Sequence, residues 1–197
     1  MEGYYNLSEL KEIGWTDKMV RELLPNPELR KNPLYANAAP MKLWKIQDVE
    51  AAMRTDAYAA ASEKAANRRA AAKKAAVTRE EKTVEQSRKI ADMIHVRIRP
   101  ADEVMKAAYR KKNEQSRNNN YYLDPMSSIP EDVLHRWAVN YIRHDLTRYD
   151  KDLDLIKGRT GKQAAYGIIK RETLLKIAEA YPEFADECRR QAGEKLV

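Results

Sequence analysis

The stretch from Asn32 to Ala52, NPLYANAAPMKLWKIQDVEAA, decides the fold of the N-terminal part of the chain. It begins with Pro and Asn residues that favour a loop, and it ends in a pattern typical of a helix. The sequence MKLWK, residues 41–45, lies between these two parts. It is too short for a helix, and its alternation is typical of one β-strand.

Successive side chains of a strand point to opposite faces, so the strand separates its residues into two sets. We expect Met41, Leu43 and Ile46 to face a small core, and Lys42 and Lys45 to face outward. Two interpretations of Trp44 stay open because its ring is amphipathic. We favour packing in the core over contact with a ligand at the surface.

Two short helices are expected before this strand. Asn6 and Glu9 have the spacing of a capping box at the start of the first helix, and Gly14 can end it. Thr16 can cap the second helix, and Pro25 ends it. The order helix, turn, helix, loop, short strand and helix fits a small winged helix with a two-stranded wing, although an ordinary helical hairpin explains the first two helices equally well.

A set of short motifs in the same order resembles the DNA-binding subdomain of the xeroderma pigmentosum group A repair proteins. The motifs are Thr16-Asp17, Leu23-Leu24-Pro25, Asn32-Pro33, Met41-Lys42-Leu43-Trp44 and Val49. The layout is also similar to winged helices of the MerR and excisionase type. The resemblance covers about residues 6–80 and implies a winged helix that binds DNA. Two features depart from the repair proteins: Trp44 stands where they usually have Tyr, and their four-cysteine zinc module is absent.

The positive charge of the chain is concentrated in its middle third. Residues 1–57 contain 8 Lys/Arg and 9 Asp/Glu, residues 58–117 contain 16 and 8, and residues 118–197 contain 13 and 13. The middle segment therefore accounts for the net charge of +7. Such a segment favours a polyanionic partner.

The sequence YAAASEKAANRRAAAKKAAVTREEK, from Tyr58 to Lys82, contains no Gly or Pro and predicts a helix of about 37 Å. Small alanines between the Lys and Arg residues would let this helix approach a phosphate backbone. Two other interpretations are a solvated connecting helix and a linker that folds on binding. The residues expected to bind nucleic acid are Lys64, Arg68, Arg69, Lys73 and Lys74 on this helix, Lys42 and Lys45 in the wing, and Lys18 and Arg21 for sequence readout.

Helices are also expected in the rest of the chain. Residues 84–98 predict a further helical segment, although residues 94–99 also alternate like a strand. Pro100 marks the start of another helix. The polar stretch from Lys111 to Ile129 is the best linker candidate, and Ser127 or Ser128 could cap the helix that follows it.

The last part of the sequence predicts a small helical bundle. One amphipathic helix is expected from about residue 131 to Gly158, another from Lys162 to Ala180, and a short one after Tyr181-Pro182. The expected fold is thus mainly α, with a winged-helix domain (residues 1–57), a basic helical segment and linker (58–117) and a C-terminal bundle (118–197).

No motif in the sequence requires an enzyme. The single cysteine, Cys188, excludes a disulfide framework and a multi-cysteine zinc site. His135 and His144 fall on opposite sides of one helix, which argues against a metal pair. Tyr141, His144, Asp145 and Arg148 could form a local polar group. We expect no catalytic residue, cofactor or metal.

We therefore predict a nucleic-acid-binding protein without catalytic activity. DNA is the expected partner, RNA is the alternative, and the C-terminal bundle could bind a protein partner or form a homodimer. No apolar run is long enough to span a membrane, so we expect a soluble, cytoplasmic protein. Two other functions stay open: an adaptor whose basic helix docks on an acidic protein or a ribonucleoprotein, and a small nucleic-acid-processing enzyme that uses His144.

Overall fold

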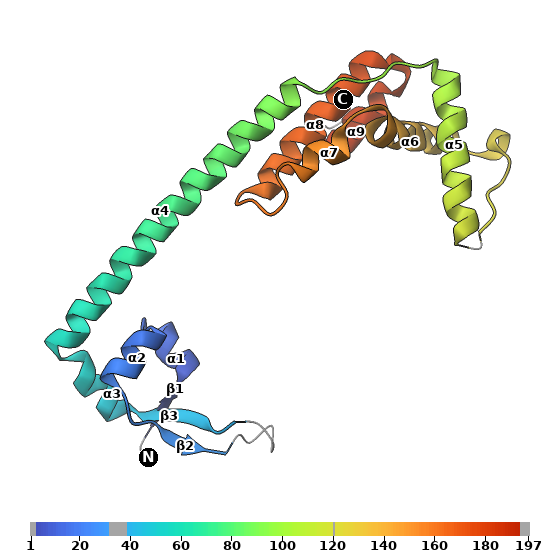
Figure 1. Ribbon diagram of the computed structural model, residues 1–197. Helices are drawn as coiled ribbons and strands as arrows, with labels where there is room; N and C mark the ends of the chain where they lie inside the picture. Colours follow the sequence, from blue (N-terminus) through green and yellow to red (C-terminus); the bar gives the residue numbers. More distant parts are fainter. Residues whose placement is uncertain (1–2, 32–38, 120, 194–197) are drawn as a thin grey trace. The chain divides into compact units, whose positions relative to one another are not determined.

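The computed structural model describes residues 3–31, 39–119 and 121–193 (Figure 1). The described chain is mainly helical with one small antiparallel sheet, which confirms the predicted fold class at this level. The chain forms two compact units, residues 1–75 and 76–197. The boundary between them falls inside one helix, α4 (Asp56–Asp92).

The elements up to this helix are β1 (Tyr4–Asn6), α1 (Leu7–Glu12), α2 (Asp17–Leu23), β2 (Glu28–Arg30), β3 (Met41–Lys45) and α3 (Ile46–Met53). After α4 follow α5 (Ala101–Asn118), the 3₁₀ turn η1 (Met126–Ser128), α6 (Glu131–Tyr141), the π-helical turn η2 (Ile142–Leu146), α7 (Tyr149–Asp154), α8 (Lys162–Ala180), the 3₁₀ turn η3 (Pro182–Phe184) and α9 (Ala185–Ala192). No helix among the described residues is both long enough and apolar enough to cross a bilayer.

The predicted strand forms the centre of the sheet. The strand order is β1-β3-β2, and both outer strands are antiparallel to β3. Tyr5 lies opposite Trp44, while Asn6 and Glu28 lie opposite Leu43 from the two sides. The sheet therefore has a third strand, β1, that the expected two-stranded wing lacked. Part of the loop expected between Pro25 and Pro40 lies outside the described residues.

Trp44 packs in the core of the first unit, so the favoured interpretation is confirmed. Its ring is 5% exposed, and its Nε1 donates a hydrogen bond of 2.9 Å to the Leu24 carbonyl. Leu43 is also buried, but it points to the opposite face of the sheet and does not belong to this core. Leu43 is therefore buried as expected, but outside the core that contains Trp44. The core consists of Leu10, Trp15, Met19, Val20, Leu24, Trp44 and Val49.

The two short helices before the loop have the predicted caps. Asn6 accepts a 3.0 Å hydrogen bond from the Glu9 amide, and the Glu9 carboxylate accepts one of 2.7 Å from the Asn6 amide. Gly14 follows α1 with a φ of 102°, a left-handed conformation that disfavours side chains. The Thr16 hydroxyl accepts from the Met19 amide at the start of α2. Local hydrogen-bond chemistry therefore sets both helix starts.

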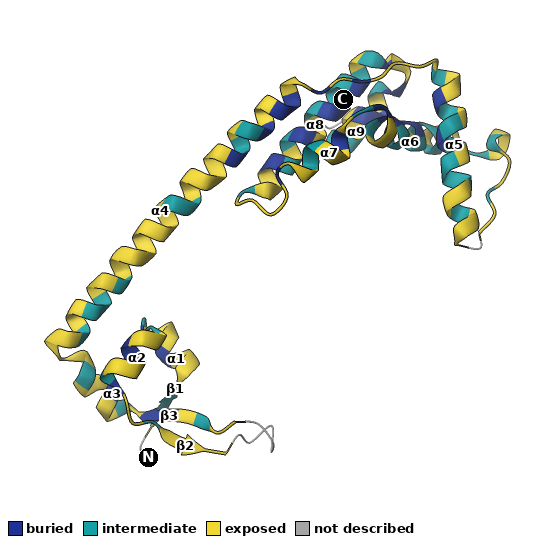
Figure 2. Cartoon of the chain, in the orientation of Figure 1, coloured by how far each residue is buried: buried dark blue, intermediate teal, exposed yellow. Residues whose placement is uncertain are grey.

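Helix α4 is anchored differently in the two units (Figure 2). In the first unit, Tyr58, Ala61 and Ala65 pack against the core, and the Tyr58 ring centroid lies 4.9 Å from that of Trp15. In the second unit, α4 buries a stripe that consists of Thr83, Ser87, Ile90 and Ala91. The helix is longer than the predicted segment from Tyr58 to Lys82.

The second unit has two neighbouring apolar clusters. The last turn of α4 packs with Tyr149, Ile156 and Ile169, and Ile94 joins this cluster just after the helix ends. The other cluster joins α5, α6, α8 and α9 through Val104, Ala138, Val139, Ile142, Leu174, Ile177 and Phe184. Helix α8 has the predicted bounds, and the predicted short helix after Tyr181-Pro182 is α9.

The helical prediction for residues 84–98 is confirmed up to Asp92, where α4 ends, but it is wrong for residues 94–98, which are neither helix nor strand. The Arg97 amide donates to the Leu146 carbonyl at 2.9 Å, and the Arg99 amide donates to the Tyr181 hydroxyl at 2.9 Å. The backbone of this segment therefore pairs with distant residues. Ile98 is 71% exposed, so it does not pack in a core.

The prediction of a single amphipathic helix from residue 131 to Gly158 is also wrong, because the helix is interrupted after η2. Thr147 has an extended backbone, and its hydroxyl accepts a 3.0 Å hydrogen bond from the Tyr149 amide. This hydrogen bond lies in the turn between η2 and α7, and α7 itself has no side-chain cap. The buried stripe is thus divided between two helices.

The compact units differ from the expected domain boundaries. Much of the expected linker is helical because α5 continues to Asn118, and its buried residues Val104 and Ala108 pack this helix into the second unit. The next helix, α6, begins after Pro130 without a side-chain cap. Ser127 and Ser128 lie in η1, so the predicted serine cap is wrong.

Candidate nucleic-acid interface

All nine cationic residues expected to bind nucleic acid have exposed side chains. The structure brings six of them to two hollows in the first unit. Lys18, Lys64, Arg68 and Arg69 line the first, and Arg21 and Lys42 line the second. The remaining three are Lys45, Lys73 and Lys74.

The first hollow, here termed the α2–α4 groove, has a volume of about 450 Å³. One wall comes from α2 and carries Lys18. The other wall comes from the first turns of α4 and carries Lys64 and Arg68, with alanines between them. Its lining residues are Thr16, Lys18, Met19, Glu22, Ala60, Ala61, Lys64, Ala65, Arg68 and Arg69.

Packing explains why these cations meet. Ala61 and Ala65 face the core of the first unit. Lys64 and Arg68 are one helical turn apart, so they lie on one stripe beside that packed face. Small side chains at the contact allow two helices to approach closely. The groove thus combines a shallow alanine floor with cationic rims.

The cations of the groove differ in how they are paired. Lys18 lies 3.6 Å from Glu22, a loose ion pair at an exposed site. Arg69 donates a 2.9 Å hydrogen bond to the Gly14 carbonyl, so this side chain also fastens α4 to the turn after α1. Within the described chain, Lys64 and Arg68 form no ion pair or hydrogen bond through their side chains. These two cations are therefore the most available to a ligand.

The second hollow, the Trp44 cleft, has a volume of about 420 Å³. Arg21 reaches it from α2, where its Nε donates to the Asp17 carbonyl at 3.3 Å. Lys42 reaches it from β3, two residues before Trp44 and therefore on the same face of the sheet. The Asp17 carboxylate also lines this cleft but pairs with Lys11 at 2.9 Å.

Lys45, Lys73 and Lys74 lie outside both hollows. Lys45 pairs in register with Tyr4 across the sheet, on the face opposite Lys42. Lys73 and Lys74 are exposed farther along α4, and Lys74 has an interaction partner. The nine predicted residues therefore do not form one continuous site.

The outer face of the sheet holds a polar group that the sequence analysis missed. Arg30 lies 4.3 Å from the centre of the Tyr4 ring and donates a 2.8 Å hydrogen bond to Glu28. Hydrogen bonds from Arg30 and Tyr4 lower the pKa of the Glu28 carboxyl. Strand β2 is short and follows two prolines, so its pattern was too brief to predict this cation near the sheet.

The polar group predicted around His144 has different partners. His144 Nδ1 lies 2.9 Å from Asp150, while Asp145 accepts a 2.6 Å hydrogen bond from Lys111. The break after η2 places Asp150 beside His144, and no sequence pattern gave that break. Among the described residues, no group of three or more His, Cys, Asp or Glu side chains could hold a metal ion.

Comparisons of the chain with protein-family models, with curated proteins and with solved structures find no match. The resemblance to the group A repair proteins therefore stays a prediction.

Proposed function

We propose that this protein binds nucleic acid, with DNA as the expected ligand, through the α2–α4 groove. The observation that carries this proposal is the convergence of Lys18, Lys64 and Arg68 from two helices on one alanine-floored groove. Phosphate contacts by Lys and Arg supply most of the affinity of nonspecific nucleic-acid binding. Arg can also contact a phosphate through two parallel hydrogen bonds.

The Trp44 cleft supports a second contact with the same ligand. Arg21 lies on α2 one turn from Lys18, so one helix presents cations to both hollows. In this proposal α2 has the role of a recognition helix, and the sheet with Lys42 has the role of a wing. The motif resemblance supports this assignment, as does the order of the elements.

Alanine substitution is the direct test of the groove. The triple variant Lys18→Ala, Lys64→Ala and Arg68→Ala removes three of the four cations that line the groove and keeps helix-forming residues. Arg69 is left unchanged because its hydrogen bond to Gly14 supports the fold. The matched control is Lys151→Ala, Lys157→Ala and Lys170→Ala, which removes the same charge from exposed positions of the second unit.

The measurement is fluorescence anisotropy of a labelled DNA duplex, a single strand of the same sequence and an RNA duplex across a salt series. If the wild-type protein neutralises about four phosphates, log affinity should fall with log salt at a slope of about −3.6 for duplex DNA. The groove variant should reduce the magnitude of this slope by about 2 to 3, and the control should keep the wild-type slope.

Two results would contradict the proposal. One is the absence of binding to all three nucleic acids at low salt, and the other is an equal loss of slope in the groove variant and the control. The first result would favour the adaptor function, in which the basic part of α4 docks on an acidic protein. The second would show that nucleic acid binds through general positive charge and not through the groove. The ranking of the three ligands decides between DNA and RNA.

A further inference from the structure

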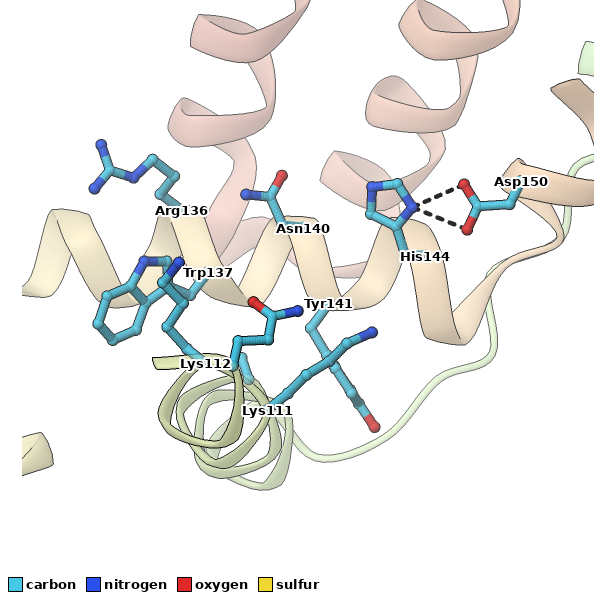
Figure 3. Close-up of a pocket in the computed structure, with 10 residues that line it drawn as sticks. Lys111, Lys112, Arg136, Trp137, Asn140, Tyr141, His144 and Asp150 are labelled. Carbon is cyan, nitrogen blue, oxygen red and sulfur yellow. Dashed lines mark hydrogen bonds and ion pairs between the residues drawn. The ribbon is translucent and has the colours of Figure 1, made fainter. Parts of the chain in front are cut away.

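A cleft between α5 and α6 in the second unit has no role in the function proposed above (Figure 3). Its volume is about 590 Å³, within the usual range for small-molecule sites. Its chemically distinctive lining residues are Lys112, Arg136, Trp137, Tyr141, His144 and Asp150. We term it the α5–α6 cleft.

The cleft contains cations that are available to an anion. Within the described chain, Lys112 forms no side-chain hydrogen bond or ion pair, and Arg136 forms none either but interacts electrostatically with Glu187. Lys111 is different because Asp145 accepts its 2.6 Å hydrogen bond. Lys112 and Arg136 come from different helices, so the fold brings two available positive charges to one hollow.

An aromatic surface adjoins these cations. Trp137 and Tyr141 are one helical turn apart on α6, and both are half-buried. The other tryptophans, Trp15 and Trp44, are only 1% and 5% exposed. Trp137 is therefore the indole ring that a dissolved ligand can reach. An accessible indole beside Lys and Arg is the combination that stacks a base and holds its phosphate.

The end of the cleft that holds His144 has the opposite polarity. His144 Nδ1 lies 2.9 and 3.0 Å from the two Asp150 oxygens, drawn as dashed lines in Figure 3. The Arg143 guanidinium lies 3.3 Å from His144 Nε2, and a guanidinium only donates hydrogen bonds. Nε2 therefore accepts and Nδ1 carries the proton that Asp150 accepts. The Asp150 carboxylate is therefore the acidic group at this end of the cleft.

We propose that the α5–α6 cleft binds a nucleotide, with its phosphate at Lys112 and Arg136, its base on Trp137, and its amino or hydroxyl groups directed toward Asp150. The opposite charges at the two ends set this orientation, because Asp150 would repel a phosphate. An acidic peptide would use the cations but would gain little from the indole surface or from the carboxylate end. The ligand is either a free mononucleotide or one nucleotide of a single strand.

The test uses the full chain and two readouts. Adenosine monophosphate, adenosine, inorganic phosphate and a five-nucleotide deoxyadenosine strand are titrated by calorimetry. Tryptophan fluorescence is followed in parallel with correction for absorption by the base. Adenosine monophosphate should bind more tightly than adenosine or phosphate and should quench the fluorescence, because its base stacks on the half-buried Trp137.

Two variants test the two parts of the cleft. Lys112→Ala with Arg136→Ala should weaken binding of adenosine monophosphate at least tenfold and leave adenosine unchanged. Trp137→Leu should abolish the quenching and weaken the binding of both adenosine monophosphate and adenosine. The matched control, Lys106→Ala with Lys170→Ala, removes two exposed cations outside the cleft and should bind like the wild type. Circular dichroism checks that each variant folds.

The possible outcomes distinguish a free nucleotide from a single strand and also test whether the cleft binds a nucleotide at all. Tighter binding of the five-nucleotide strand than of the mononucleotide, lost in the Lys112 and Arg136 variant, identifies a single strand as the ligand. Equal affinities identify a free nucleotide. The proposal is overturned if adenosine monophosphate does not quench the fluorescence, or if the control variant loses as much affinity as the cleft variant. It is also overturned if a glutamate-rich peptide binds more tightly than adenosine monophosphate. None of these variants changes the α2–α4 groove, so the two proposals fail independently.

Discussion

The two parts of helix α4 have the same regular backbone but depend on different interactions. Residues 56–75 carry alanines and cations, and Tyr58, Ala61 and Ala65 provide their limited contact with the core of the first unit. Residues 76–92 place Thr83, Ser87, Ile90 and Ala91 inside the second unit. The first part therefore keeps its surface available for a ligand, whereas the second part stabilises the fold.

This difference shows how one helix can combine two tasks. The first part relies on the helix propensity of alanine, so its side chains need not be buried. The second part relies on tertiary packing, which is the usual source of helix stability in proteins. Substitutions in the two parts should therefore affect different measurements.

The largest expected effect is the loss of packing in the second part. Ile90 is 5% exposed, and Ile90→Ala should lower the free energy of unfolding by about 3 kcal/mol because it leaves a cavity. Val77 on the same helix is 48% exposed, so Val77→Ala should cost less than about 0.5 kcal/mol. Urea unfolding followed by circular dichroism measures both. Equal effects would refute the division of the helix.

The next effect concerns the end of α4. Lys176 Nζ donates hydrogen bonds of 3.0, 2.9 and 3.0 Å to the carbonyls of Ala91, Asp92 and Ile94. Lys176→Met keeps the approximate length of the side chain but removes the charge and these donors. It should therefore lower the free energy of unfolding by about 2 kcal/mol. Lys170→Met, at an exposed position on α8, is the control. Faster amide exchange at residues 88–94 in the first variant alone would confirm the role of Lys176.

A smaller effect is expected where the first part of α4 meets its core. Tyr58→Leu removes the contact with the Trp15 ring but keeps an apolar side chain, and it should cost about 1 kcal/mol. Tyr121 is 73% exposed, so Tyr121→Leu should leave stability unchanged. Urea titration of the two variants compares them. An unchanged midpoint for Tyr58→Leu would mean that alanine contacts alone hold this part of the helix.

The smallest effect separates two adjacent arginines. Arg69→Ala removes the exposed hydrogen bond to Gly14 and should cost about 0.5 to 1 kcal/mol. Arg68→Ala breaks no such bond and should leave stability unchanged while it weakens nucleic-acid binding. Thermal unfolding and anisotropy on the same samples measure the two properties. Equal stability loss in both variants would assign Arg68 a structural role.

The sequence predicted elements whose determinants are local. The capping box of Asn6 and Glu9, the turn at Gly14 and the cap at Thr16 all depend on residues within one helical turn. The bounds of α8 were equally predictable because Gly161 precedes it and Tyr181-Pro182 follows it. Gly161 has a φ of 79°, and a Cβ there would lie 3.1 Å from the Glu80 Cα.

The features that were not predicted depend on long-range contacts. Tyr4–Asn6 is too short to show a strand pattern, and only its pairing with β3 makes it one. The pattern of residues 94–99 is compatible with a helix. In the structure, however, the backbone amides of Arg97 and Arg99 donate to the Leu146 carbonyl and the Tyr181 hydroxyl. The sequence was sufficient to predict which Lys and Arg residues would be exposed. Their distribution over two hollows required the packing of α2 against α4.

Cys188 has a practical consequence for experiments on this protein. Burial, followed by the nearby Glu187 carboxylate, raises the pKa of its thiol to about 12. It is the only cysteine of the chain, and at neutral pH it is protonated and 1% exposed. Maleimide reagents should therefore leave the folded protein unlabelled. A cysteine introduced at an exposed position of α4, such as Ala71→Cys, would then carry a single dye without removal of the native residue.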